Sequence, residues 1–260
     1  MARTSTTDRP RSLDEALDTA LALPTGRVRA YVDGIRRKRP HATPEEVVRL
    51  LEKRYLLAVS TSGGAVGAAA ALPVVGTGTA LALTVGQVAT FLGASSLLAL
   101  AVADVHGIAV EDRARRRALL LTALLGENGP EVLQQELGLS AVAWGRTLLT
   151  RLPVATVQTV NKTLRGRLVK GTAAKVGSVM LGRLLPFGIG AAVGYAGSRA
   201  VGGTMIDGVR SAFGPPPATF VREVEASFVV EPAGDAGADL DTVLELDGPG
   251  SEPEDERPAS

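Results

Sequence analysis

An uncharged run of 49 residues, from Tyr55 to Ala103, limits the fold of this chain more than any other feature. Charged residues make up 21% of all 260 positions, so this run differs sharply from the rest of the chain. Proline and glycine in PVVGTG, residues 73–78, favour the end of one helix and a turn. We therefore predict a helical hairpin with arms near residues 56–72 and 79–103. Its turn is assigned to Pro73, Gly76 and Gly78.

The hairpin has two interpretations, a membrane-inserted pair of helices or the buried centre of a soluble bundle. A hydrocarbon core about 30 Å thick requires roughly 17–25 apolar helical residues, which both arms supply. Gly63, Gly67 and Ala71 repeat at the spacing that lets membrane helices approach closely. Alanine and glycine insert less favourably than leucine, which supports the soluble alternative. The lack of a polar face in either arm favours the membrane pair.

The segments that flank the hairpin predict further helices. Ser12 and Glu15 fit a capping box, and Thr43 fits the N-cap of a helix that continues into the hairpin. The residues 176–206 form a second weakly charged region, in which only 15 residues separate Arg183 from Arg199. These 15 uncharged residues are too few to span a bilayer comfortably, so the region predicts an interfacial or re-entrant hairpin, or a glycine-rich packing partner for the first hairpin. The fold class is therefore an all-α helical bundle with two apolar hairpins.

Charge divides the chain into a basic body and an acidic tail. Residues 1–222 carry 27 Lys/Arg and 15 Asp/Glu, whereas residues 223–260 carry 1 and 12, which gives +12 and −11. Basic residues next to an apolar hairpin predict contact with the anionic leaflet of a membrane. The residues assigned to this membrane-surface basic cluster are Arg113, Arg115, Arg116, Arg117, Lys162, Arg165, Arg167 and Lys170.

The same charges predict the topology. Lys53 and Arg54 precede the hairpin and Arg113 follows it, so both termini are expected in the cytoplasm. The N-terminal sequence is polar and shows no secretory signal. We divide the chain into N-terminal amphipathic helices (1–42), a main helical domain (43–217) and an acidic disordered tail (218–260).

The tail predicts a protein partner. Its sequence ADLDTVLELD, residues 238–247, places leucine and valine among carboxylates, as in segments that fold on binding. We also expect the tail to compete with anionic lipid for the membrane-surface basic cluster.

Few residues suit catalysis. The chain has no cysteine, which excludes disulfides and thiol chemistry, and it has only two histidines. Asp104 and His106 lie two positions apart at a helix end, so they face different sides and do not form a close pair. We predict no catalytic, cofactor or metal residues, and basic clusters without aromatic residues do not favour nucleic acid. The alternative is a hydrolase or transferase at the membrane surface, with Asp104, His106 and Glu111.

The residues 81–126 and the later stretches LGRLLPFGIGAAVGYAGSRAVG and AFGPPP resemble the EcsC family. The resemblance covers roughly residues 45–217, and in VHGIAVED it places His106 where the family usually has tyrosine. It implies a bacterial, all-helical, membrane-associated protein, and it transfers no catalytic residues because the family has no established catalytic activity. Together with the residues, it predicts a non-enzymatic scaffold or accessory factor for a transporter or envelope process.

Overall fold

The computed structural model describes residues 13–70, 77–126, 128–138, 143–183 and 189–221. Side chains are described for these residues except at 13–14, 70, 77–85, 170–183 and 189–190. The predicted turn residues Pro73 and Gly76 and the acidic tail from Arg222 onward lie outside the described residues. All of the described residues belong to one compact unit that comprises residues 1–227.

The described residues form helices and contain no strand, so the all-α prediction is confirmed. The bounds are α1 Leu13–Leu21, α2 Thr25–Lys38, α3 Pro44–Ala70, α4 Thr77–Val105, α5 Arg113–Leu124, α6 Asn128–Leu137, α7 Trp144–Thr150, α8 Val154–Arg183 and α9 Ile189–Phe213.

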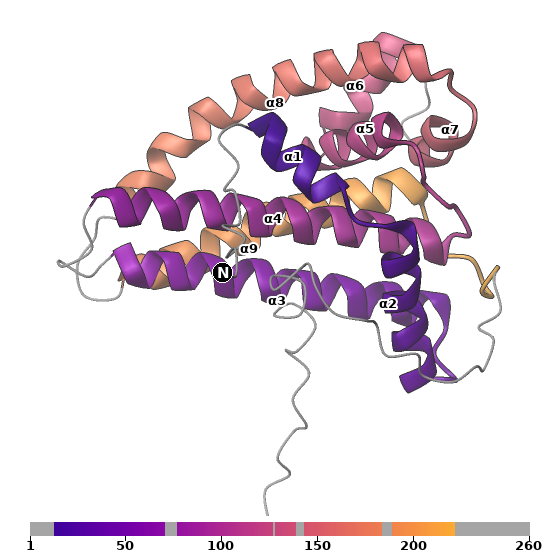
Figure 1. Cartoon of the computed structure of the whole chain (residues 1–260), viewed down its shortest axis with the longest axis horizontal. Coiled ribbons are helices and arrows are strands. Elements are labelled where there is room, and N and C mark those ends of the chain that lie inside the picture. The colour runs from indigo at the N-terminus through magenta and orange to yellow at the C-terminus, as the bar shows by residue number, and fades with distance from the viewer. Residues whose placement is uncertain (1–12, 71–76, 127, 139–142, 184–188, 222–260) are drawn as a thin grey trace, which may run out of the picture. The chain divides into compact units, whose positions relative to one another are not determined.

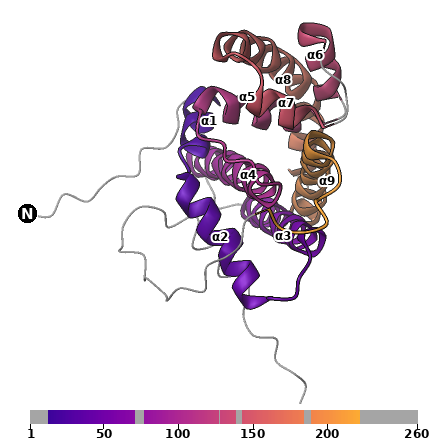
Figure 2. The same ribbon diagram turned by 90° about the vertical axis from the view of Figure 1, so that its right-hand side faces the viewer.

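The long helices α3, α4 and α9 lie side by side, and α5 to α8 form a second layer beside them (Figures 1 and 2). The short helices α1 and α2 both pack on α4. Every described helix contributes apolar side chains to the core, and α4 and α5 bury the longest runs of them. Core residues include Leu98, Ala101, Leu120, Leu121, Trp144, Leu148, Met205 and Val209.

Glycine brings α3 and α9 together at backbone distance. A Cβ atom added at Gly63 would lie 2.6 Å from the carbonyl oxygen of Gly194, and one at Gly194 would lie 2.3 Å from that of Gly63. Further along, Gly202 of α9 lies against Tyr55 of α3, so the two helices run antiparallel. The second weakly charged region is thus a packing partner of the first hairpin. The small-residue spacing around Gly63 is used in a helix contact within one chain.

The second half of α4 is interior to the bundle. Among the described residues, one helix is long and apolar enough to cross a membrane, namely α4 over Gly86–Val105, and 67% of that stretch is buried. The sequence had suggested two such arms, but the described uncharged part of α3, residues 55–70, follows Glu52, Lys53 and Arg54 and is only 16 residues long. Gly78, predicted in the turn, instead belongs to the first turn of α4.

Candidate functional site

One end of α3, α4 and α9 carries no charged residue. The chain is uncharged over residues 55–70 of α3, 77–103 of α4 and 189–198 of α9. The last turns of α3 and the first turns of α4 and α9 lie at the same end of these helices, on the left in Figure 1. We call this region the uncharged end.

The water-facing positions of the uncharged end are occupied by apolar or hydroxyl side chains. On α3 the exposed residues of this region, besides Leu57, are Thr61, Ala65 and Ala68. On α9 they are Ala192, Tyr195 and Ala196. Exposed large apolar residues continue beside them, at Leu57, Val88 and Val201. A surface of this kind, on ends contributed by three helices, is typical of contact with a membrane or a partner.

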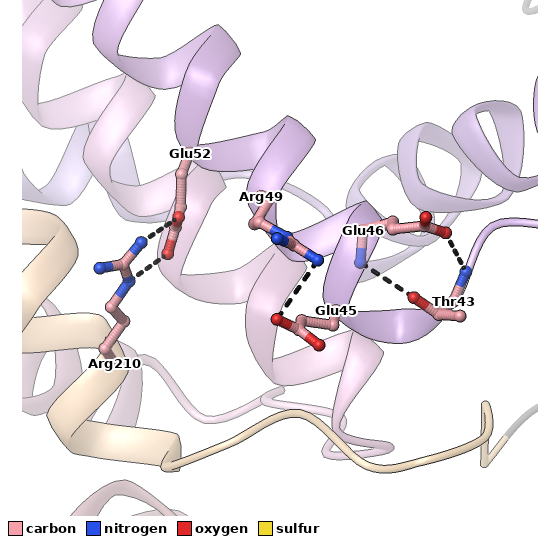
Figure 3. Close-up of polar contacts among 6 residues, drawn as sticks. All are labelled: Thr43, Glu45, Glu46, Arg49, Glu52 and Arg210. Atoms are coloured by element: carbon pink, nitrogen blue, oxygen red, sulfur yellow. Dashed lines mark hydrogen bonds and ion pairs between the residues drawn. The ribbon is translucent and has the colours of Figure 1, made fainter.

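The opposite end of α3 has charged side chains on the same face. Exposed Glu45, Arg49 and Lys53 precede Leu57 at intervals of four residues, so one stripe of α3 changes from charged to apolar along its length. Arg49 pairs with Glu45 at 3.3 Å on this stripe (Figure 3). The helix therefore presents two chemically different ends to its surroundings.

The predicted cap of α3 is confirmed. The backbone N–H of Thr43 donates to Glu46 Oε2 at 2.8 Å, and the N–H of Glu46 donates to Thr43 Oγ1 at 3.3 Å (Figure 3). The hydrogen bond from the Thr43 N–H lowers the pKa of Glu46 below its usual value. This capping box fixes the corner between α2 and α3.

A basic groove of about 560 Å³ lies at this corner. Its apolar lining comes from Pro40, Ala42, Val47 and Leu50, and its basic residues are Arg39, His41, Arg49 and Lys53, with Glu46 as the acidic member. Among the residues that the structure describes, neither Arg39 nor Lys53 is held in an ion pair. This site was not predicted from the sequence, although RRKRPH at 36–41 is the densest run of basic residues before α3.

Two polar contacts hold the charged end of α3 in the bundle. Arg210 of α9 donates to both carboxylate oxygens of Glu52, at 2.7 and 2.6 Å (Figure 3). The hydroxyl groups of Tyr55 and Ser95 form a buried hydrogen bond of 3.0 Å, which joins α3 to α4. Burial raises the pKa of Tyr55 above its usual value. These contacts favour a fixed role for Glu52 and Tyr55 in packing.

The members of the predicted membrane-surface basic cluster do not all face solvent, because one of them, Arg116, is buried. Arg116 is 6% exposed and donates to the carbonyl oxygens of Val110, Leu21 and Leu23 and to the hydroxyl of Thr25. Burial lowers its pKa. Arg116 therefore joins α5 to the corner between α1 and α2, and it does not face a membrane surface.

The other three predicted arginines of α5 differ from one another in exposure. Arg115 donates to the carbonyls of Leu149 and Leu152 at the end of α7, and Arg117 pairs with Asp18 of α1 at 3.5 Å. Arg113 is exposed. Three of the four predicted arginines of α5 thus bind groups of this chain, since they lie where neighbouring helix ends present carbonyls or a carboxylate.

The α8 members of the cluster lie together on one helix. Lys162, Arg165 and Arg167 are exposed, and Arg167 donates to Gln135 of α6 at 3.2 Å. Lys170 belongs to α8 as well, and its side chain lies outside the described ones. Arg113 and this α8 group are what remains of the predicted surface cluster.

The residues of the alternative enzyme do not converge on one another. His106 is buried, donates from Nδ1 to the carbonyl of Val102 at 2.9 Å and packs against Phe213 with ring centroids 5.2 Å apart. Asp104 pairs with Arg29 of α2 at 3.7 Å, and Glu111 is exposed. Across the described part of the chain, no group of three or more histidine or acidic side chains suits a metal ion.

Comparison with known protein families, with characterised proteins and with solved structures gave no match.

Proposed function

We propose that this protein is a non-enzymatic, membrane-associated helical protein that inserts its uncharged end into one leaflet. The observation that carries the proposal is the exposed face of α3 and α9, where Ala65, Ala68, Ala192 and Tyr195 occupy positions that meet water. Burial of such a surface in lipid is favourable because it removes apolar area from water.

The depth of insertion follows from the charges that bound the uncharged end. Arg199 is the first charged residue of α9, and it follows ten uncharged positions, 189–198. Ten helical residues extend about 15 Å, roughly half of a hydrocarbon core about 30 Å thick. One-leaflet insertion therefore agrees better with the length of this part of α9 than a full crossing does. It also leaves α4 in the bundle, where its second half is packed.

This geometry has consequences for location and partners. A protein that enters one leaflet keeps both termini on the same side, which for the cytoplasmic membrane of a bacterium is the cytoplasm. Anionic lipid is the partner we expect, with Arg113 and the α8 residues Lys162, Arg165 and Arg167 as candidate headgroup contacts. An EcsC-like scaffold or accessory role in a transporter or envelope process is the biological setting that the sequence resemblance favours.

The test is a vesicle flotation assay with two alanine-to-arginine variants. Ala65→Arg places a charge on the exposed face of the uncharged end, where insertion of a charge costs up to about 2.5–3.5 kcal/mol. We expect at least roughly tenfold weaker vesicle binding, because each 1.4 kcal/mol is a factor of ten. Ala155→Arg is the matched control. Ala155 is also exposed, but it lies in the first turn of α8, outside the uncharged end.

Salt treatment separates apolar insertion from surface attraction. Bound wild-type protein should remain with the vesicles in high salt, since apolar burial is not screened by ions whereas exposed charge pairs are. Equal flotation of the two variants, or release of the wild-type protein by salt alone, would contradict insertion of the uncharged end. Failure of the wild-type protein to float at all would favour the soluble bundle with a buried hairpin.

A further inference from the structure

The groove between α2 and α3 combines an apolar floor with a basic rim. Val47 and Leu50 lie beside Arg39, Arg49 and Lys53 in a hollow of about 560 Å³. An apolar floor and separated positive charges match an extended acidic peptide that carries aliphatic side chains. This combination differs from the uncharged end, and the groove residues of α3 precede the exposed Ala65 by at least 12 residues, about 18 Å at 1.5 Å per residue.

The last described residues of the chain lie near this corner. After α9 ends, Phe220 lies under the guanidinium group of Arg36, which is 3.9 Å from the ring centroid. Arg36 is in the last turn of α2, three positions before the groove residue Arg39. The described chain ends one residue later, at Val221, and continues as the acidic segment that begins at Glu223.

We propose that the groove binds the chain's own acidic segment, residues 223–260. The segment carries net −11, includes valine and leucine among its carboxylates, and is tethered beside the groove by Phe220. A short tether gives an effective concentration on the order of mM, so even weak contacts suffice for binding. This places the acidic segment at the α2–α3 corner, because Arg115, Arg116 and Arg117 of α5 already bind other groups of the bundle.

The lysines of this chain allow a direct test. A zero-length carbodiimide joins an amine to a carboxylate only where the two are in contact, and mass spectrometry then identifies the pair. The groove contains Lys53, and Lys38 is nearby in the last turn of α2, whereas the other lysines, at 162, 170 and 175, all belong to α8. We expect cross-links between residues 223–260 and Lys53 in the full-length protein.

The source of each cross-link is settled by mixing labelled and unlabelled protein. Links within one copy support the proposal, whereas links that form mainly between copies overturn it in favour of a second molecule as the occupant. Links only to α8 would move the segment to the α8 basic residues, and the absence of any link to Lys53 would likewise overturn the groove as its site.

A pair of variants tests whether the basic rim causes the contact. Arg39→Glu with Arg49→Glu should lower the Lys53 cross-link yield roughly fivefold or more, since two surface attractions become repulsions. Arg165→Glu with Arg167→Glu makes the same charge change on α8 and should leave the yield unchanged. Circular dichroism checks folding. Arg39→Gln with Arg49→Gln removes the two charges without reversing them, so it should give an intermediate cross-link yield and serves as the test if the charge reversals disturb the corner. Equal yields in all of these variants would overturn the role of the rim.

Discussion

The segments RRKR at 36–39 and RARRR at 113–117 each carry four basic residues, but the structure places their side chains in different surroundings. In the first, Arg37, Lys38 and Arg39 are exposed beside the groove. In the second, Arg116 is buried among carbonyl oxygens and Arg115 caps the end of α7. One basic segment is thus available to a ligand, whereas the other holds the bundle together.

Position within the helix explains the difference. The first segment closes α2 beyond its last buried residue, Ile35, where the dipole already stabilises positive charge and water solvates it. The second opens α5, where the dipole disfavours positive charge, and the next residues, 118–121, are core. Arginines there gain stability from unpaired carbonyls at the ends of neighbouring helices. A count of basic residues therefore does not by itself identify a binding surface.

The largest expected effect is from removal of the buried arginine. Arg116→Leu leaves the carbonyls of Leu21, Leu23 and Val110 without their donor, and we expect a loss of about 3–5 kcal/mol in the free energy of unfolding. Denaturant unfolding measures it, and Arg116→Lys should be intermediate because it keeps the charge. A loss below about 1 kcal/mol would contradict the structural role.

A smaller loss in the free energy of unfolding is expected when Arg115 is replaced. Arg115→Ala removes the donors to Leu149 and Leu152, which costs about 1–2 kcal/mol and loosens the end of α7. Denaturant unfolding and faster amide exchange in α7 report this. Arg113→Ala is the matched control in the same turn, because Arg113 is exposed and should change stability by less than about 0.5 kcal/mol. Equal losses in both variants would remove the distinction between them.

The capping box beside the exposed segment predicts a dependence on pH. The pKa of Glu46 is lowered in the folded state, so its contribution to stability is present above the usual value of 4.5 and is lost as the pH falls through the lowered value. Glu46→Gln should reduce the loss of stability in acid. Thermal unfolding of both proteins between neutral and acidic pH measures this, and identical pH profiles would contradict it.

The smallest effect on stability is expected in the exposed segment itself. Lys38→Ala with Arg39→Ala removes two water-facing charges, so the free energy of unfolding should change by less than about 0.5 kcal/mol per residue. The same pair should weaken retention of residues 223–260 in the groove. Denaturant unfolding checks the first result and cross-linking to Lys53 checks the second; a large loss of stability would show that this segment also supports the fold.

Much of the helical layout follows from local patterns. The N-cap at Thr43 and the helix that continues into the uncharged run agree with the sequence analysis. These features depend on neighbours within about four residues. The burial of Arg116 was not predicted, because three of its partners, at Leu21, Leu23 and Thr25, lie more than 90 residues away in sequence.

The sequence alone determined the all-α class, the division of charge between body and tail, and the uncharged character of the hairpin. These are sums or short-range periodicities, which do not depend on how helices pack. Only the tertiary structure decided that α9 covers α3 through Gly63 and Gly194, that half of α4 is core, and which arginines face water. Those outcomes depend on contacts between distant segments, since a side chain's burial is set by the helix that packs against it.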